Sequence, residues 1–334
     1  MTSVKRSCEF AALLALSSVL PACAGGQSPG RLEILDAEWH LAGFENSLDL
    51  SGIASSNGTE VLVGSDESFY VQPGVIEAGK KRIESRRLIA LPVQNGGGGE
   101  VDIEGVAFSS QDQAYYVVGS HGVGKKKGDF QEDRHSIYRV PVGPDGKVRK
   151  EEVRRASLLP WLEKTPLLAP HVKQPLQRNG LNIEGLAWSG GRLYFGLRAP
   201  NKNGRGLVVE ASPGEIFGGK PRPLEVHEIG IPSGRGIREI VAVRDGFLIL
   251  TGNASAEASK KFPVTMATGP DTRFDLLHWK GAGSITADKV GRLPENGGKA
   301  EALLVLKDDT DHSDVLVIFD GLQGGQPITV RVHR

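Results

Sequence analysis

Four glutamates and one serine recur at a similar position along the chain, each at the start of a short apolar run. The intervals between them are 53, 80, 55 and 62 residues. The five positions are Ser51, Glu104, Glu184, Glu239 and Glu301. Carboxylates gathered in one place suit a hard cation, because Ca²⁺ takes about six to eight oxygen ligands. The four glutamates are therefore candidate metal ligands, and Glu104 and Glu184 are candidate catalytic groups as well.

A second set of polar residues closes the same repeats. Its members are Asp66, His121, Arg198, Asn253 and Asp320. His121 stands in a Gly-Ser-His-Gly turn, where an imidazole has room to meet a ligand and could act as acid or base near neutral pH. We expect this set to bind a ligand, with His121 as a further catalytic candidate.

Basic residues are frequent in the loops that would lie beside these positions. They are Lys125, Lys126, Lys127, Arg134 and His135, then Arg198, Lys202 and Arg205, and finally Lys260 and Lys261. Carboxylates at depth with lysine and arginine at the rim suit an anionic ligand, bound directly or through a metal. Loop lysines are also commonly no more than solvated side chains, so both interpretations stay open.

The repeated glutamates also admit a purely structural role. Four ionised carboxylates in a ring repel one another unless protons or cations compensate them. Arg238, next to Glu239, is an internal candidate for that compensation. Alternatively, each glutamate accepts backbone N–H groups from a neighbouring repeat and so fastens the repeats together. A residue type that is present in nearly every repeat suits such a role.

The elements that must position these residues are repeated hairpins. Each repeat holds an apolar strand, a tight polar turn such as Ser55-Ser56-Asn57-Gly58, and a second strand rich in Val, Leu, Tyr and Phe. Gly, Asn and Asp in the turns supply the positive φ that hairpins require. The repeats are 48–66, 101–121, 181–198, 236–253 and, more weakly, 299–320. Further strands are expected at 87–93, 136–142, 207–211 and 274–280.

Four-stranded units repeated along a chain predict an all-β protein, a β-propeller formed by residues 31–334. The spacing favours five blades, although the longest interval leaves room for a sixth. Residues 151–179 in that interval are charged and proline-rich, and we interpret them as an insertion between blades. A strand at 31–41 is expected to pair with a C-terminal strand at 327–333 and close the ring, which removes two sheet edges. An open sandwich of hairpins is the alternative.

The N-terminal segment has the pattern of an export signal. Lys5 and Arg6 precede an apolar stretch at 11–20 that is too short to span a bilayer. Leu20-Pro21-Ala22-Cys23 follows and matches the lipobox, in which the cysteine receives the lipid. A polar, glycine-rich segment comes directly after it.

Residues 1–22 are thus predicted to be a lipoprotein signal peptide and residues 23–30 a flexible tether. We expect a cell-envelope protein anchored to a membrane through the lipidated Cys23. The residues after Cys23 lack the aspartate that resembles an inner-membrane retention signal, which favours the outer membrane, facing the periplasm or the exterior. A soluble secreted protein cut after Ala22 is the rival interpretation.

Composition excludes several classes of function. The two cysteines are Cys8 and Cys23, so the predicted mature domain has no internal disulfide, cysteine nucleophile or thiolate metal site. Basic and acidic residues balance at 40 each, which argues against nucleic-acid binding, since that function needs a strongly basic face.

Four short motifs carry a family resemblance. They are Asp102-Ile103-Glu104-Gly105, Asn182-Ile183-Glu184-Gly185, Gly119-Ser120-His121-Gly122 and Gly196-Leu197-Arg198-Ala199-Pro200. Together they resemble an uncharacterised bacterial family, domain of unknown function 3616. The resemblance covers most of 48–321 and implies a propeller, but it carries no assigned activity. More distantly, the Glu-Gly-(Val/Leu)-Ala repeats are similar to phytase-like and esterase-like propeller proteins.

Two functions are open at this point. The one we favour is a tethered binding module that holds an anionic small molecule, a polymer or an envelope partner on the charged face at the channel mouth. The other is a phytase-like, metal-dependent hydrolase of phosphate or other esters, in which a Ca²⁺ ion held by the glutamates activates water. A glycosidase fits less well, because it needs two acids in distinct environments and the glutamates look equivalent.

Overall fold

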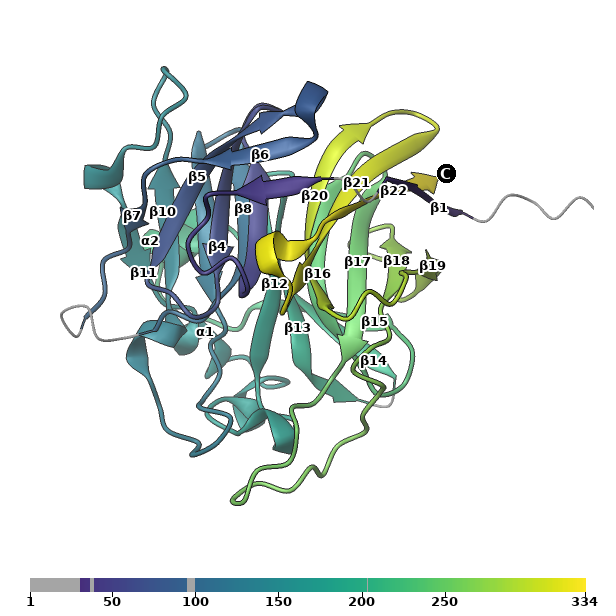
Figure 1. The fold of residues 1–334 in the computed structure, drawn as a ribbon. Helices are drawn as coiled ribbons and strands as arrows, with labels where there is room; N and C mark the ends of the chain where they lie inside the picture. Colours follow the sequence, from purple (N-terminus) through teal and green to yellow (C-terminus); the bar gives the residue numbers. More distant parts are fainter. Residues whose placement is uncertain (1–30, 37–38, 95–99, 203) are drawn as a thin grey trace, which may run out of the picture.

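Five β-sheets stand around a common axis as the blades of a propeller (Figure 1). The computed structural model describes residues 31–36, 39–94, 100–202 and 204–334. The predicted all-β, five-bladed fold is confirmed. The predicted signal peptide at 1–22 and tether at 23–30, with Cys23, lie outside the described residues. Among the described residues, no helix reaches the length and apolarity that crossing a membrane requires.

The blades are numbered in chain order, and the strands of each blade are given from the innermost one outward. Blade 1 holds β3 (Leu50–Ser55), β4 (Glu60–Ser65), β5 (Tyr70–Glu77), β6 (Arg82–Ser85) and β7 (Ile89–Ala90), with β2 (His40–Ala42) at its edge. Blade 2 holds β8 (Ile103–Ser109), β9 (Ala114–Gly119), β10 (Ile137–Pro141) and β11 (Arg154–Ala156). Blade 3 holds β12 (Asn182–Ser189), β13 (Arg192–Lys202), β14 (Arg205–Ala211) and β15 (Glu225–Gly230).

The last two blades complete the ring. Blade 4 holds β16 (Arg235–Val243), β17 (Gly246–Asn253), β18 (Asp275–Trp279) and β19 (Ala287–Arg292). Blade 5 holds β20 (Lys299–Asp308), β21 (His312–Asp320), β22 (Ile328–His333) and β1 (Leu32–Asp36). The helices are short: α1 (Leu159–Leu162), α2 (Pro213–Gly218) and the 3-10 turns at Ala78–Lys80, Glu132–His135, Lys150–Glu152, Ala169–His171, Leu176–Arg178 and Gln323–Gly325.

Blade 5 is built from both ends of the chain, as predicted. Strand β1 pairs antiparallel with β22, and the two lie side by side in Figure 1. The end of the expected 31–41 strand behaves differently, because β2 pairs in parallel with β6 at the edge of blade 1. The N-terminal segment therefore joins the last blade to the first.

Two expected elements differ from the structure. The third strand of blade 1 is β5, whereas the sequence predicted a strand at 87–93. The prediction overlooked β5 because the Pro73-Gly74 pair inside it is typical of a turn. Residues 151–179 begin with β11, the outermost strand of blade 2. The segment then forms α1 and turns whose apolar side chains, such as Trp161 and Leu168, join the core shared with blade 3.

Glycines after the repeated glutamates allow neighbouring innermost strands to approach closely. A Cβ atom on Gly105 would lie 2.8 Å from the backbone nitrogen of Leu186 in the next blade. On Gly185 it would lie 2.7 Å from the backbone nitrogen of Ile240 in the blade after that. The Glu-Gly pair of the repeat is thus a packing requirement of the ring.

Replacing Gly185 by alanine tests this requirement. The added methyl group meets backbone atoms that cannot move aside singly, so we expect Gly185→Ala to lower the free energy of unfolding by about 1–3 kcal/mol. Gly214→Ala is the matched control, because a Cβ atom there has nothing within 4 Å. Urea denaturation of the two variants measures the difference, and equal stabilities would contradict the close approach.

Candidate functional site

A cavity of about 320 Å³ opens at the end of the channel where the innermost strands begin. Such a volume suits a small molecule. Most of the expected site residues line it: Asp66, Glu104, Glu184, Arg198, Asn253, Glu301 and Asp320. The other walls come from Lys125, Lys126, Gln177, Arg238, residues 255–259, Asp271, Phe274 and Lys299. Two expected residues, Glu239 and His121, do not line this cavity.

A β-bulge at the start of each innermost strand turns one side chain out of the regular ladder. The bulged residues, each at a shift in pairing register, are Ser51, Glu104, Glu184, Arg238 and Glu301. A bulge re-aims the side chain of its extra residue, and it is frequent beside functional sites. Four of the five line the cavity, whereas the Ser51 hydroxyl donates a 2.5 Å hydrogen bond to the carbonyl oxygen of Ile103.

Glu239 is one residue out of step with the other glutamates. The bulged residue of blade 4 is Arg238, and Glu239 stands where blade 3 has Gly185. Its Oε1 accepts hydrogen bonds from the N–H of Leu186 in blade 3, at 3.1 Å, and of Ile240, at 2.8 Å. Glu239 therefore fastens blade 3 to blade 4, which is the structural role left open above, and it does not join the expected ring of metal ligands.

Arg238 connects three blades at the floor of the cavity. Its Nη1 lies 2.8 Å from Oε2 of Glu184 in blade 3, and its Nη2 contacts the Glu301 carboxylate in blade 5. Arg198 donates from Nη1 to the other Glu184 oxygen at 2.9 Å. Burial alone would raise the pKa of Glu184, but Arg238 and Arg198 outweigh burial and hold that pKa below its ordinary value. Glu184 is therefore ionised and neutralised by the protein itself.

Arg198 and Asn253 position loops over the cavity. Arg198 donates from Nε to the carbonyl oxygen of Asn253 at 3.1 Å and from Nη2 to that of Ser255 at 2.6 Å. The Asn253 side chain donates to Asp271 at 2.5 Å and accepts from the backbone of Gly269 at 3.1 Å. The Arg198 guanidinium is thus committed to internal partners at every nitrogen.

Calcium ligation by the glutamates has little support in this arrangement. Arg238 already compensates Glu184 and Glu301, and Glu239 points away from the cavity. Across the described ranges, no three of the expected ligands bring their oxygens within 4.8 Å of one another. At this mouth, the carboxyl groups that form no ion pair with a described residue are those of Glu104, Asp66, Asp271 and Glu257.

His121 lies behind the cavity wall. It is buried, and its Nδ1 is 2.9 Å from the carbonyl oxygen of Gly119. The N–H of Leu158 donates to its Nε2 at 3.1 Å, so Nδ1 carries the proton. Burial, together with His135, lowers the pKa of His121 to about 3. His121 is a neutral residue that fastens the segment after β11 to blade 2, and it has no free nitrogen for a ligand.

Glu104 and Asp66 are two carboxyl groups of the cavity wall that form no ion pair with a described residue, and the exposed Asp271 and Glu257 are the others. Glu104 is buried, and within the described part of the chain its carboxyl group forms neither an ion pair nor a hydrogen bond. Burial, then the charges of Glu184 and Asp102, raise its pKa well above the ordinary value. The Oδ1 atom of Asp66 is buried without a hydrogen-bond partner. Burial, with the charges of Asp102 and Asp320, raises the pKa of Asp66 to about 8.

Lys125 and Lys126 are the basic rim residues that reach the cavity. Both are exposed, and they form no ion pair with any residue that the structure describes. Gln177 fixes their loop, since its Nε2 donates to the carbonyl oxygens of Lys125, at 3.0 Å, and Glu257, at 2.9 Å. The two ammonium groups are therefore available to a ligand.

The other basic residues expected at the rim lie elsewhere or have partners. Arg134 pairs with Glu100 at 2.6 Å and with Asp102 at 3.1 Å. Residues of the expected rim that do not line the cavity are Lys127, Arg134, His135, Lys202, Arg205, Lys260 and Lys261. The rim is thus less basic than the loop sequences suggested.

In the segment 254–273, sequence reasoning singled out Lys260 and Lys261 for the rim but missed residues 255–259 and Asp271, which line the cavity. This segment joins β17 to β18 and extends beyond the strand ends in Figure 1. Its length was the available signal, because long loops without regular structure in a compact domain are commonly functional.

Comparison with solved structures finds matches at low sequence identity. The allergen Mala s 1 of Malassezia sympodialis has a TM-score of 0.41 and 13% identity, with 84% of this chain and 77% of that one covered. A streptogramin B lyase has a TM-score of 0.40 and 10% identity, with coverages of 91% and 98%. A putative glucose dehydrogenase from Thermus thermophilus has a TM-score of 0.40 and 14% identity, with coverages of 90% and 99%. Likeness at this level assigns no activity.

Sequence comparison identifies the family. No curated protein matches the chain. The model of a family described as a protein of unknown function, DUF3616, matches residues 49–141 and 145–327, which include the bulged ring and all residues of the cavity wall. The chain therefore belongs to the DUF3616 family, as its repeated motifs predicted.

Proposed function

We propose that this protein is a ligand-binding propeller whose cavity holds a small molecule that carries an anionic group. The observation that supports this most strongly is the pair Glu104 and Asp66 in the cavity wall, because Glu104 is buried and the Oδ1 atom of Asp66 is buried without a hydrogen-bond partner. Burial raises the pKa of Asp66 to about 8 and the pKa of Glu104 well above its ordinary value, which favours the protonated form of each. A protonated carboxyl group donates a hydrogen bond, which an ionised one cannot do. Lys125 and Lys126 supply positive charge at the rim.

The charge balance of the cavity supports the same ligand class. With Asp66 and Glu104 protonated, the remaining charged residues of the wall are matched in number. The acidic ones are Glu184, Glu257, Asp271, Glu301 and Asp320, and the basic ones are Lys125, Lys126, Arg198, Arg238 and Lys299. The guanidinium groups are used internally. The groups that remain for a ligand are the carboxyl groups of Glu104 and Asp66, the ammonium groups of Lys125 and Lys126, and the exposed carboxylates of Glu257 and Asp271.

Hydrolysis is less well supported than binding. A hydrolase needs an ionised carboxylate that can act as a base or hold a cation. Glu184 is ionised, but both of its oxygens are engaged by arginine. Glu104 and Asp66 have no arginine partner, but the pKa of each is raised, which favours the protonated form over the carboxylate that such a reaction needs. Binding asks for no group that this cavity lacks.

The first prediction concerns ligand binding and its dependence on pH. Titration calorimetry with succinate, citrate and glycerol phosphate should detect binding near pH 6.5 that weakens about tenfold toward pH 9, because ionised Asp66 repels an anion. The double variant Asp66→Asn, Glu104→Gln keeps N–H donors and should bind with little pH dependence. Lys125→Gln with Lys126→Gln should weaken binding at both pH values.

Lys127→Gln is the matched control, since Lys127 is in the same loop but does not line the cavity. Binding that strengthens above about pH 8, or that prefers Ca²⁺ or an organic cation, would contradict the anionic ligand. Such a result would instead assign the two carboxyl groups to a positively charged ligand.

The second prediction concerns stability and tests the proton on Asp66 directly. The unfolded carboxyl group has an ordinary pKa, whereas the folded one keeps its proton to about pH 8. Folding therefore takes up a proton between about pH 4 and 8, and wild-type stability falls as the pH rises through that window. Asp66→Asn escapes this loss, so its stability relative to wild type should grow by at most about 1.4 kcal/mol for each pH unit.

Urea denaturation at about pH 5, 6.5 and 8 measures this gain. Glu257→Gln is the matched control at the exposed rim of the same cavity, where solvent screens the carboxyl group. A difference between Asp66→Asn and wild type that stays constant over the three pH values would exclude the raised pKa.

The location in the cell envelope is part of the same proposal. The lipobox sequence supports a lipid anchor on Cys23, which would present the propeller at a membrane surface. Radiolabelled palmitate should be incorporated into the full-length chain and not into a Cys23→Ser variant. A wild-type chain that is released in soluble form after cleavage at Ala22 would exclude the anchor and leave a secreted propeller.

A further inference from the structure

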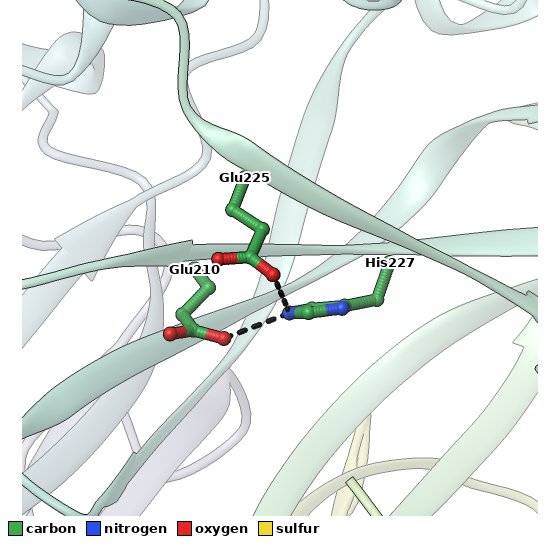
Figure 2. A group of neighbouring side chains, drawn as sticks. All are labelled: Glu210, Glu225 and His227. Carbon is green, nitrogen blue, oxygen red and sulfur yellow. Dashed lines mark hydrogen bonds and ion pairs between the residues drawn. The ribbon is translucent and has the colours of Figure 1, made fainter. Parts of the chain in front are cut away.

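Three potential metal ligands meet on the outer strands of blade 3. Glu210 in β14 pairs directly across the ladder with Glu225 in β15, and His227 follows two residues after Glu225. Residues two apart on a strand share a face, so all three side chains project from the same side of the sheet. Figure 2 shows the Nε2 atom of His227 directed at both carboxylates.

The distances within this cluster are short. The Nε2 atom of His227 is 2.8 Å from Oε2 of Glu210 and 3.9 Å from Oε1 of Glu225. One ligand atom of each residue lies within 4.8 Å of the others. The side chains of Glu210 and His227 are 7% and 10% exposed, whereas Glu225 is 59% exposed. Two ligands are thus held in place, and the third lies on the side open to solvent.

Neighbouring residues orient the two buried ligands. Arg192 forms an ion pair with Oε1 of Glu210, which leaves Oε2 for another partner. The centroid of the His227 ring lies 5.5 Å from that of Trp279 in blade 4 and 6.4 Å from that of Tyr194 in β13. Partners of this kind fix the orientation of metal ligands and strengthen binding.

We propose that Glu210, Glu225 and His227 bind a Zn²⁺ ion. An imidazole nitrogen with two carboxylate oxygens is a donor set that zinc accepts, whereas Ca²⁺ and Mg²⁺ prefer oxygen ligands alone. Zinc–ligand distances of about 2.0–2.2 Å place the ligand atoms of a tetrahedral site about 3.4 Å apart. The distances of 2.8 and 3.9 Å lie on either side of that value, so small movements of the side chains create the site.

This site is separate from the cavity at the channel mouth. Glu210 pairs with Tyr194 near the β12–β13 turn, whereas Glu184 and Arg198 are at the opposite ends of those strands. The three protein ligands leave a fourth tetrahedral position for water or for a further ligand. The proposal therefore does not depend on the anionic ligand of the cavity.

Titration calorimetry of the full-length chain in detergent, with Zn²⁺ alone as the probe, tests the site. We expect one ion per chain with a Kd of about 1 µM or lower. His227→Gln should weaken binding at least about 100-fold and Glu225→Gln at least about tenfold. Glu225 is largely exposed, so its variant folds whatever the metal does. Zn²⁺ should also raise the Tm of the wild-type chain but not that of His227→Gln.

His333→Gln is the matched control, because His333 pairs with a single carboxylate, Glu33, at 3.2 Å. It should bind Zn²⁺ as the wild-type chain does, and so should Asp66→Asn with Glu104→Gln. Absence of Zn²⁺ binding to the wild-type chain at about 100 µM, or binding that both His227→Gln and Glu225→Gln retain, would overturn the proposal.

Discussion

The charge on Arg238 determines how the centre of this propeller is organised. Removing an ionised group from water costs several kcal/mol, and a buried carboxylate is tolerated only with a partner. Arg238 is buried and reaches Glu184 in the preceding blade and Glu301 in the following one. A single guanidinium group therefore pairs with two carboxylates and links blades 3, 4 and 5 around the axis, while Arg198 supplies a second positive charge to Glu184.

The ring is consequently unequal, and its asymmetry creates the site. Bulges bring one residue of each blade to the channel mouth, but Arg238 reaches only two of the three bulged glutamates. Glu104 is on the side without an arginine partner, next to Asp66 and Asp102. Burial and the like charges then raise the pKa of its carboxyl group. The part of the ring that the protein leaves uncompensated is the part that can interact with a ligand.

The blades could be predicted from the sequence because each one buries alternate side chains of a similar hairpin. The same pattern of apolar strands and polar turns therefore recurs along the chain. The roles of the glutamates could not be predicted, because they depend on neighbours in other blades. Glu104 and Glu184 have almost identical local sequences, yet only Glu184 meets an arginine. An alignment on the isoleucines Ile103, Ile183 and Ile237, rather than on the acids, would have placed Arg238 in the ring and Glu239 in the glycine position.

His121 failed as a site residue for a related reason. A histidine in a glycine-rich turn has space in the sequence, but the segment after β11 fills that space and donates a backbone N–H to its ring. Residues distant in the sequence determine which groups pack around a turn, so the local sequence alone cannot predict them. Glu104 and Asp66 show the opposite outcome. No described residue forms an ion pair with their carboxyl groups, and both line the cavity.

The physical cause of the raised pKa values also limits the class of ligand. Burial and nearby negative charge make the ionisation of a carboxyl group unfavourable, but they do not destabilise its protonated form. A ligand that accepts hydrogen bonds from protonated Asp66 and Glu104 does not require either group to ionise, so its binding does not include the free-energy cost of ionisation. A cation would gain from the negative surroundings but would have to displace the protons first. With two lysines at the rim and the arginines engaged, the arrangement supports the proposed ligand, an acceptor that carries an anionic group.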